Sequence, residues 1–575
     1  MTPTTARREL LDLWRGMKEE RDFYMPTWRD IVTFILPEAG RWLTGGGGRR
    51  GQPNMGSILN SAATESLDVS AAGMASSLTN PARQWFRMTT ADPALAEVGP
   101  VREYLASVER LVSWLFARSN VHGVLVVMYR NVMAFGTAPI WVDSDDTDIL
   151  RAHTWPVGQY ALASSNQQRI DTVGLEFEFT VRQMMQEFGD ANPAFSTQLK
   201  RLIERREFNQ RVSVLKLVCP NEDLDLAALD GRQRPFTGSW LELVGDDDLP
   251  VLRQAGYSQF PAMVGRWTVN STEDVYGIGP CHRVLPDVKQ LQHTEDQKLK
   301  VLDKLVAPPL NHPGSATGDL PSIMAGALNI TSPTATQKTE PTYVPDVRSY
   351  QLAVEQVREL VARIREGLNE DLWRLLSNRA DEDPSGRMTA FEVARRHEEK
   401  LILLGPTVDR FHNEVLSPLI KRTVAILAEH RLLPPPPDEL VEELARGGDV
   451  RIEYQSVLAL AQRLLGLGSL ERFAGIVSSL APDPNDPLWD KVDRDEFLDQ
   501  VGDSLGLPPN VVRSDDVVAE IRLSRARDME RQKQLQEGAV AAGTARDLAQ
   551  APLLSGGSAL DQLLSNMGPV AEGVA

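Results

Sequence analysis

Only a few residues in this sequence have the type and spacing that enzyme chemistry requires. His397-Glu398-Glu399 begins like the His-Glu-x-x-His zinc motif, but Lys400 follows and the second histidine is missing. Cys281-His282 would form a thiol–imidazole pair, although a packed cysteine beside a surface histidine is the simpler interpretation. Two acidic runs, Asp246–Asp248 and Asp381–Asp383, could bind a divalent ion, but turn formation is again the simpler account.

Phosphate and nucleophile chemistry is not indicated either. The run Gly45–Gly48 is neither preceded by a strand pattern nor followed by Gly-Lys-Ser/Thr, so it does not fit a phosphate-binding loop. The sequence contains no Walker motif and no Gly-x-Ser-x-Gly elbow. Its two cysteines, Cys219 and Cys281, are too few for a disulfide framework or a Cys-rich zinc site. We therefore predict a protein that is not an enzyme and that holds no cofactor and no metal.

Length and charge limit the class of protein further. A chain of 575 residues suffices for three or four domains, and 42% hydrophobic content excludes a wholly disordered chain. The net charge of −18 argues against tight nucleic-acid binding over the surface, but it allows contact with DNA without retention. No apolar run approaches the roughly 18 residues of a membrane span, and the start of the chain lacks a signal-peptide pattern. We expect a chain of cytoplasmic origin with reduced thiols.

The elements that organise the chain lie between Tyr276 and Leu433. We predict a helix from Pro286, then a Pro-rich extended or small β segment over Pro308–Pro345, with a disordered linker as the alternative. Apolar residues at helical spacing then predict a helix from Asp346 to about Leu376, roughly 45 Å long. After the loop Asn378–Met388, a further helix should be kinked at Pro406 and Pro418. Taken alone, these helices would equally suit a helical core or a coiled coil.

The segments on either side are predicted to differ in character. The N-terminal part begins with helices over 5–36, 58–78, 101–117 and 121–134. It continues with strands over 138–142, 169–180, 211–218, 239–244 and 263–269, and with short helices near 181–188 and 195–204. Beyond Pro434–Pro437 we predict a helical region over 438–514 that includes Tyr454–Leu465 and Leu470–Leu480. A charged helix over Asp515–Gln536 precedes a tail beyond Gly538 that should be frayed or helical only in an assembly. The fold class is α+β with a mainly antiparallel sheet.

Several stretches together resemble the head-to-tail connector, or portal, proteins of short-tailed, podovirus-like bacteriophages. Their order and spacing carry the resemblance, which extends from about residue 7 to about residue 530. The stretches are Ala71-Ala-Gly-Met74, Leu78-Thr-Asn-Pro81, Trp85-Phe86, Gly256-Tyr257, Phe260-Pro261, Arg266-Trp267, Tyr276-Gly-Ile-Gly-Pro280, Leu285-Pro-Asp-Val288, Pro308-Pro-Leu310, Arg387-Met-Thr-Ala390, Leu404-Gly-Pro406, Leu416-Ser-Pro-Leu419, Tyr454-Gln-Ser456 and Leu458-Ala459. Val457 stands where that pattern has proline, and the Ala/Gly-rich tail is unmatched.

The resemblance implies a portal fold and a ring of about twelve copies around double-stranded DNA that passes through without tight binding. The implied domains are the wing (1–275), first stem helix (276–307), clip (308–345), second stem helix (346–377), channel loop (378–388), wing-to-crown helix (389–431), crown (432–514) and C-terminal helix with tail (515–575). The implied partners are the terminase large subunit, tail adaptor proteins, and capsid and scaffolding proteins. The implied location is a unique capsid vertex of the virion, after assembly in the bacterial host cytoplasm.

Three groups of site residues follow from this map. The channel loop should project into the lumen through Asn378, Arg379, Asp381, Glu382, Asp383 and Arg387. Lysines of the first stem helix could line the channel, although ordinary exposed helix charges remain an alternative: Lys289, Lys298, Lys300 and Lys304. The clip should dock the packaging ATPase and later tail proteins through Pro308, Pro309, His312, Pro313, Lys338 and Tyr343.

Two other classes of function remain open on these residues. A helical scaffold or adaptor of a virion would use the same long helices without a DNA channel, and images of the purified protein would show rods instead of rings. A DNA-processing enzyme would show metal-dependent nuclease or ATPase activity, which the missing motifs argue against.

Overall fold

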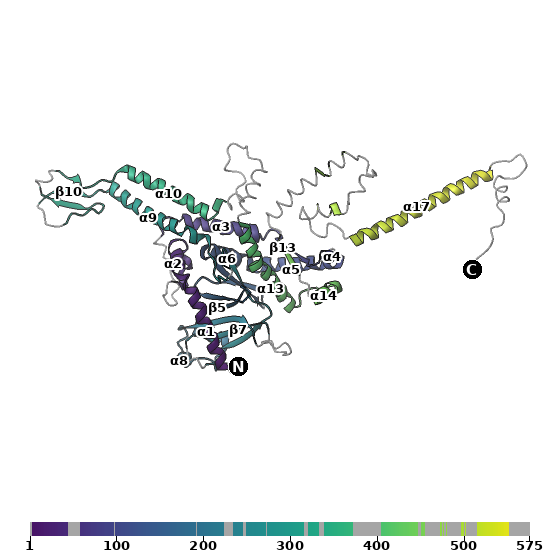
Figure 1. Ribbon diagram of the computed structural model, residues 1–575, viewed down its shortest axis with the longest axis horizontal. Coiled ribbons are helices and arrows are strands. Elements are labelled where there is room, and N and C mark those ends of the chain that lie inside the picture. Colours follow the sequence, from purple (N-terminus) through teal and green to yellow (C-terminus); the bar gives the residue numbers. More distant parts are fainter. Residues whose placement is uncertain are drawn as a thin grey trace, which may run out of the picture. The chain divides into compact units, whose positions relative to one another are not determined.

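The computed structural model describes residues 3–43, 58–96, 98–145, 147–190, 192–222, 234–244, 249–271, 273–314, 320–332, 338–371, 404–446, 450–454 and 515–550, and a few residues between 472 and 501. The chain divides into two compact units. The first comprises Met1–Met88, Ser107–Pro435 and Arg451–Ser469, and the second comprises Thr89–Ala106, Pro436–Val450 and Leu470–Ala575. Figure 1 gives the element labels used below.

Helices from the N-terminal part of the chain form much of the core of the first unit. They are α1 (Pro3–Asp22), α2 (Met25–Phe34), the 3-10 turn η1 (Pro37–Trp42), α3 (Ala62–Leu78), α6 (Val121–Phe135) and the part of α5 (Gly99–Arg118) from Ser107 onward. The predicted break near Pro26 is confirmed, since Pro26 is the second residue of α2. Small residues make up most of α3, and nine of its side chains are buried. No single described helix is long and apolar enough to cross a membrane; only α5 and α6 together, bent by 76°, meet the length and composition required.

Two antiparallel sheets lie in this unit and confirm the predicted α+β class. One has the order β4-β5-β6-β7-β8 and the other β3-β2-β9. Their bounds are β2 Thr137–Asp145, β3 Ile149–Thr154, β4 Tyr160–Ser164, β5 Ile170–Thr180, β6 Arg211–Pro220, β7 Phe236–Glu242, β8 Arg253–Tyr257 and β9 Ala262–Arg266. The short helices α7 (Val181–Phe188) and α8 (Thr197–Glu204) lie between β5 and β6 in the chain, close to their predicted positions.

A buried lysine joins the two sheets. The Lys216 ammonium on β6 lies 4.0 Å from the ring centre of Trp141 on β2 and 5.2 Å from that of Trp240 on β7. Asp143 on β2 is its only carboxylate neighbour by salt bridge among the described residues, at 3.8 Å. Burial lowers the pKa of Lys216 to about 8, and the aromatic faces offset part of that desolvation.

Two predicted helix boundaries in the central region are wrong. The first long helix, α9, spans Pro280–Val306 and so begins six residues before Pro286, which lies inside it. Pro280 also suits a first helical position, and Gly279 precedes it in an extended conformation. The second, α10, spans Val347–Gly367 and ends nine residues before Leu376, because Asn369 adopts a left-handed conformation with φ of 57°. Glu370 and Asp371 are helical again, and the residues that follow lie outside the described part of the chain.

The helix expected beyond residue 388 is described from Leu404 onward. Residues 404–411 are α-helical, but the carbonyl with which the Pro406 ring would clash lies outside the described residues, so the kink expected there stays a prediction. A π-helical turn, η3 (His412–Leu416), then precedes α13 (Ser417–Glu429). Pro418 lacks an N–H group and its ring would clash with the carbonyl four residues earlier, which accounts for the wider turn at this point.

The remaining elements include three in the second unit, which are α4 (Pro93–Ala96), α14 (Asp438–Ala445) and α17 (Asp515–Gln550). Tyr454 ends strand β13 (Val450–Tyr454), so the helix predicted to begin there does not start at that residue. The charged helix α17 is longer than predicted, because the alanine-rich stretch after Gly538 continues it to Gln550. A short strand that the sequence analysis missed, β1 (Phe86–Thr90), follows Trp85.

Candidate functional site

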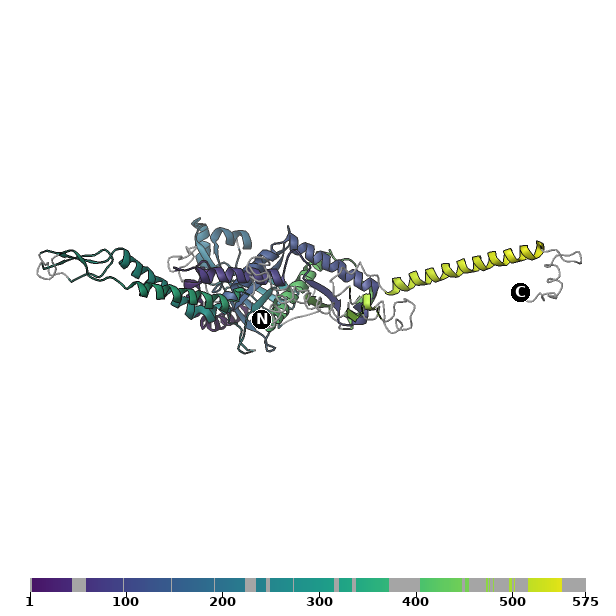
Figure 2. The same ribbon diagram turned by 90° about the horizontal axis from the view of Figure 1, so that it is seen from above.

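The candidate site is the pair of long helices and the small sheet that joins them. In both views α9 and α10 lie side by side and extend away from the sheets of the first unit (Figures 1 and 2). The connecting segment forms a three-stranded sheet of order β11-β10-β12. Its strands are β10 Leu310–Pro313, β11 Leu328–Thr331 and β12 Glu340–Pro341, so the predicted small β segment is confirmed within the described residues.

An aromatic cluster holds the start of α9. Tyr276 lies 5.2 Å from Tyr24 and 5.5 Å from Trp28, measured between ring centres. Its hydroxyl accepts a hydrogen bond from the backbone N–H of Leu162 at 3.1 Å, and burial raises the pKa of Tyr276 well above its usual range. The first residue of the Tyr-Gly-Ile-Gly-Pro motif is therefore a packing anchor between the start of α2 and the five-stranded sheet.

The glycines of the same motif allow backbone to pack on backbone. Gly136 ends α6 with φ of 80°, and a Cβ atom placed on it would lie 2.0 Å from the carbonyl oxygen of Gly277. A Cβ on Gly279 would lie 2.4 Å from the carbonyl oxygen of Met133. The N–H of Gly277 donates to Thr137 Oγ1 at 2.7 Å. This junction fixes the direction in which α9 leaves the body, because no side chain separates the two segments.

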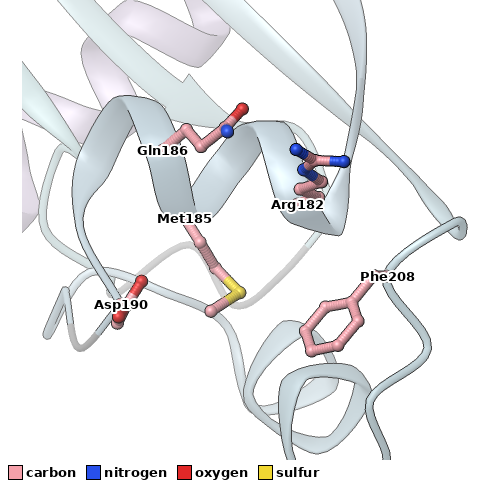
Figure 3. A pocket seen from close by; sticks show the side chains of 5 residues that line it. All are labelled: Arg182, Met185, Gln186, Asp190 and Phe208. Atoms are coloured by element: carbon pink, nitrogen blue, oxygen red, sulfur yellow. The ribbon is translucent and has the colours of Figure 1, made fainter.

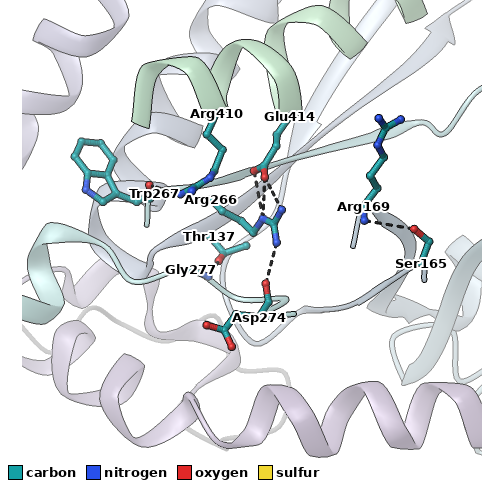
Figure 4. A network of polar contacts seen from close by, with 9 residues as sticks. All are labelled: Thr137, Ser165, Arg169, Arg266, Trp267, Asp274, Gly277, Arg410 and Glu414. Carbon is teal, nitrogen blue, oxygen red and sulfur yellow. Dashed lines mark hydrogen bonds and ion pairs between the residues drawn. The ribbon is translucent and has the colours of Figure 1, made fainter. Parts of the chain in front are cut away.

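A polar network connects this junction to the later helix (Figure 4). The Arg266 guanidinium on β9 donates from Nη2 and Nε to Glu414 Oε1, at 2.5 and 3.1 Å. Its Nη1 donates to the backbone carbonyl of Asp274 at 2.8 Å. Arg410 donates to the carbonyl of Trp267 at 3.1 Å. The loop that leads from β9 to α9 is thereby held between the strand and the helical stretch 404–416.

The returning end of α10 is anchored by α3. Ser66 donates to the buried carboxylate of Glu370 at 2.5 Å, and Ser70 donates to the carbonyl of Leu368 at 2.9 Å. Gly367 permits close contact between the two long helices, because a Cβ there would lie 2.4 Å from Val284 Cγ1. Two serines of α3 thus hold the end of α10 by hydrogen bonds.

Burial stops half-way along both helices. Gln292 on α9 is still fixed, since its Oε1 accepts from the N–H of Leu59 at 2.7 Å. Beyond Glu295 no described residue of α9 is buried, and on α10 none is buried before Val357. The outer halves instead expose large apolar side chains: Leu299 43%, Leu302 39%, Val306 77%, Val347 57% and Leu352 65%. Exposed apolar surface of this extent typically marks an interface.

Most of the lysines proposed for the channel lining form ion pairs with carboxylates of the same chain. Lys289 lies 2.6 Å from Asp30, Lys300 lies 2.5 Å from Asp296, and Lys298 contacts Glu295. Lys304 has no ion pair with another described residue. Their positive charge is thus largely balanced within one chain, and whether they face DNA stays a prediction.

The other predicted site residues fall into two groups. All six of the channel loop lie outside the described residues. On the clip, Pro309 is buried, Tyr343 is 54% exposed, and His312 shares a hydrogen bond with Thr339 Oγ1 at 2.9 Å. Pro308 and Pro313 are partly exposed and Lys338 is exposed. The sequence analysis missed three strongly exposed apolar residues here, although Leu320, Ile323 and Met324 stand out as apolar positions in a Pro- and Ser-rich segment.

The Cys281-His282 pair, which the structure describes, is not arranged for enzyme chemistry. Burial raises the pKa of Cys281 to about 12 and lowers that of His282 to about 4, so near neutral pH the pair is thiol and neutral imidazole. No group of three or more His, Cys, Asp or Glu in the described part of the chain could hold a metal ion. His397–Glu399 and both acidic runs lie outside the described residues.

One shallow cleft of about 370 Å³ lies on α7 and the loop before β6 (Figure 3). It is lined by Arg182, Met185, Gln186, Asp190 and Phe208. This set lacks a nucleophile paired with a base, so the cleft does not resemble a hydrolytic or transfer site.

The sequence comparisons identify the family. Residues 7–512 match the model for bacteriophage head to tail connecting protein, and the chain belongs to that family. A probable portal protein of Bordetella phage BPP-1 is 37% identical over 92% of both chains, and the portal protein of Salmonella phage epsilon15 is 33% identical over 95% of this chain and 96% of its own. The mixed helices and antiparallel sheets described above are the α+β fold of this family.

Similarity to solved structures is weaker. The neck of an empty GTA particle computed with C6 symmetry matches with a TM-score of 0.28 and 11% identity, covering 78% of this chain and 91% of that one. The neck of a native GTA particle computed with C12 symmetry matches with a TM-score of 0.25 and 11% identity, covering 73% and 96%. The family assignment therefore depends on the sequence matches.

Proposed function

We propose that this chain is a portal protein that forms a ring at one vertex of a bacteriophage capsid, through which double-stranded DNA is packaged and later ejected. The observation that carries the proposal is the family match over residues 7–512, together with two relatives named as portal proteins that align over more than nine tenths of this chain. The ring belongs to the virion and assembles in the cytoplasm of the bacterial host.

The exposed outer halves of α9 and α10 support a closed ring of copies, which we propose to have about twelve members. A closed cyclic assembly joins one face of each subunit to a different face of the next. The outer halves of α9 and α10 expose apolar residues that one chain leaves uncovered, such as Val306, Val347 and Leu352. Neighbouring copies would cover them, and the anchored inner halves would hold every helix pair at the same angle.

The charge of the chain suits a conduit that does not retain its cargo. Each copy carries a net charge of −18, so a ring of copies repels a phosphate backbone except where lysine and arginine lie nearby. The lysines of α9 would then make only weak, salt-screened contacts with the passing duplex. Residues 378–388 form the loop that we place in the lumen between the two helical segments.

We place the docking of the packaging motor and of tail proteins at the clip. The terminase large subunit, and after packaging the tail adaptor proteins, bind the clip surface around His312, Lys338 and Tyr343. Capsid and scaffolding proteins contact the rest of the ring. The chain itself performs no catalysis, since the packaging motor supplies the energy.

Electron microscopy of the purified full-length protein tests the ring directly. The proposal expects annular particles with a central hole wide enough for a duplex about 20 Å across. Rods or monomers at high concentration, with no annular particle in virions, would instead support a scaffold or adaptor without a channel.

A deletion tests the channel loop separately. Removing Ala380–Gly386 should leave rings intact but reduce packaging or retention of DNA in phage particles. Genome-filled particles at wild-type yield would refute the role given to this loop while leaving the ring itself unaffected.

A further inference from the structure

The surface formed by α7, α8 and the loop before β6 has a local excess of positive charge. Residues 181–211 contain six Arg or Lys and four Asp or Glu, whereas the whole chain contains 61 and 79. Arg211 pairs with Glu178 at 3.1 Å, and Glu187 pairs with Arg253 at 2.8 Å. The other arginines of this segment are exposed and have no ion pair or side-chain hydrogen bond within the described part of the chain: Arg182, Arg201, Arg205 and Arg206. Four guanidinium groups are therefore free to bind an anionic partner.

The backbone that carries these arginines is held firmly. Met184 of α7 and Leu199 of α8 are buried in one core with Trp240 of β7, so the two helices are packed on the sheet through their apolar faces. The loop before β6 is tied to the start of α7, because the N–H of Arg182 donates to the carbonyl of Phe208 at 3.3 Å. A surface on a fixed backbone loses little conformational entropy when a partner binds.

An apolar floor lies beside these charges. The cleft of about 370 Å³ on α7 has Met185 and Phe208 facing each other, with Arg182 next to them and Asp190 at the far side (Figure 3). Phe208 is 38% exposed, which is unusual for a phenylalanine in a loop that the structure holds in place. The cleft can thus receive one apolar side chain while the adjacent guanidinium binds a carboxylate.

Arg206 stands where a helix end of this type normally has glycine. The N–H of Glu207 donates to the carbonyl of Leu202 and the N–H of Arg206 to that of Ile203, both at 3.0 Å, which is the Schellman pattern. Arg206 accordingly has a φ of 58°, a conformation that residues other than glycine, asparagine and aspartate rarely adopt. It lies two residues before Phe208 in the loop. A charged side chain kept at a strained position beside a cleft points to a role in binding.

We propose that this surface, the arginine cleft (Arg182, Met185, Arg206 and Phe208), binds an acidic peptide segment of another protein. An apolar side chain of that segment lies between Met185 and Phe208, and its carboxylates bind the guanidinium groups, whose geometry matches a carboxylate. A phosphate backbone suits the cleft less well, because it offers no apolar group to the floor and is repelled by Asp190 and by a chain of net charge −18. The cleft lies within one chain, so binding does not require the proposed ring.

Fluorescence anisotropy with two labelled peptides of equal charge tests the site. In the first peptide a central Leu-Phe pair is flanked on both sides by Asp and Glu, and in the second Ser-Ser replaces Leu-Phe. The full-length protein should bind the first peptide roughly tenfold more tightly, because an apolar side chain then leaves water. Both affinities should fall as salt is added, but their ratio should persist, since salt screens charges and not apolar contacts.

Arg206→Gly separates binding from folding. Glycine adopts the left-handed conformation without strain, so the free energy of unfolding in urea should stay the same or rise, whereas the affinity for the Leu-Phe peptide should fall by roughly threefold to tenfold. Arg206→Lys keeps the charge and should bind better than Arg206→Gly. Phe208→Ser should bring the two peptides to similar affinities. Arg15→Gln, which removes one charge from an exposed part of α1, is the matched control and should change neither affinity.

Two results would overturn the inference. The first is equal binding of both peptides with no loss in Arg206→Gly or Phe208→Ser, which would show only diffuse attraction between charges. The second is tighter binding of a labelled DNA duplex than of either peptide, with loss in the same variants, which would make this surface a nucleic-acid contact. Ring formation is imaged separately, so failure of peptide binding would leave the proposed ring intact, and absence of rings would leave the peptide result valid.

Discussion

The ion pair between Arg266 and Glu414 should stabilise the first unit strongly, and its removal gives a defined test of the network around the start of α9. The Arg266 side chain is 9% exposed and that of Glu414 is 20% exposed. Arg266→Met removes the hydrogen bonds to Glu414 and to the carbonyl of Asp274. It leaves a carboxylate with little access to water and no guanidinium partner.

The expected cost follows from that exposure. Breaking a fully buried pair by removing one partner costs about 3–5 kcal/mol, and because Glu414 keeps some contact with water we expect about 2–4 kcal/mol. Arg266→Met with Glu414→Met should cost less than Arg266→Met alone, since no unpaired charge then remains buried. The coupling energy of this double-mutant cycle should be about 2 kcal/mol or more.

Urea unfolding followed by tryptophan fluorescence, at a concentration where the chain is monomeric, measures these differences. Arg234→Met is the matched control, because Arg234 pairs with Glu429 at 3.0 Å with side chains 40% and 37% exposed. It should cost at most about 1 kcal/mol. If Arg266→Met costs no more than this control, or if the double variant costs the sum of its single variants, the network does not hold the loop as we argue.

Three further outcomes can be checked on the same protein. Gly136→Ala should cost about 3 kcal/mol or more in urea unfolding, because its φ is 80° and the new Cβ would meet the Gly277 carbonyl at 2.0 Å; Gly123→Ala, with open space around it, should be neutral or slightly stabilising. Burial lowers the pKa of His412 to about 4, so the full free energy of unfolding is retained above the usual histidine pKa near 6.5. It should fall by up to about 3 kcal/mol as the pH drops toward 4, and His412→Gln should flatten that dependence. Cys281, with its pKa raised to about 12, should resist a maleimide at pH 8 in the folded protein and react once urea unfolds it; rapid modification of the native thiol would contradict its burial.

Elements with local signals were predictable from the sequence. Thr180 and Gln183 form a capping box, and α7 begins where that signal places it. The alternation of Glu and Phe over Leu175–Phe179 likewise marks β5, which pairs on both sides in an antiparallel sheet. Period and capping act over a few residues, so one sequence contains enough information to locate them.

Features decided by distant contacts were not predictable. Pro280 and Pro286 are equally good first residues of a helix, and what selects Pro280 is the contact of Gly277 and Gly279 with the end of α6, well over a hundred residues earlier. The early end of α10 depends in the same way on Ser66 and Ser70 of α3, which bind the chain just beyond Gly367. Leu320, Ile323 and Met324 were missed although they have the i, i+3, i+4 spacing of a helix, because Pro321 lies among them in a segment rich in Pro, Ser and Gly.

The distribution of burial along α9 connects fold to assembly. Its inner half is fixed by aromatic rings, glycine contacts and the Gln292 hydrogen bonds, all supplied by the same chain. Among the described residues, none of the outer half of α9 is buried, and a helix pair with exposed apolar faces gains most of its stability from packing. In the proposed ring, the body of each chain would fold alone, whereas the outer stem and the sheet beyond it would reach full stability only when neighbouring copies cover Val306, Val347 and Leu352. Ring closure and ordering of the stem would then be one cooperative step, which would discourage open or incomplete rings.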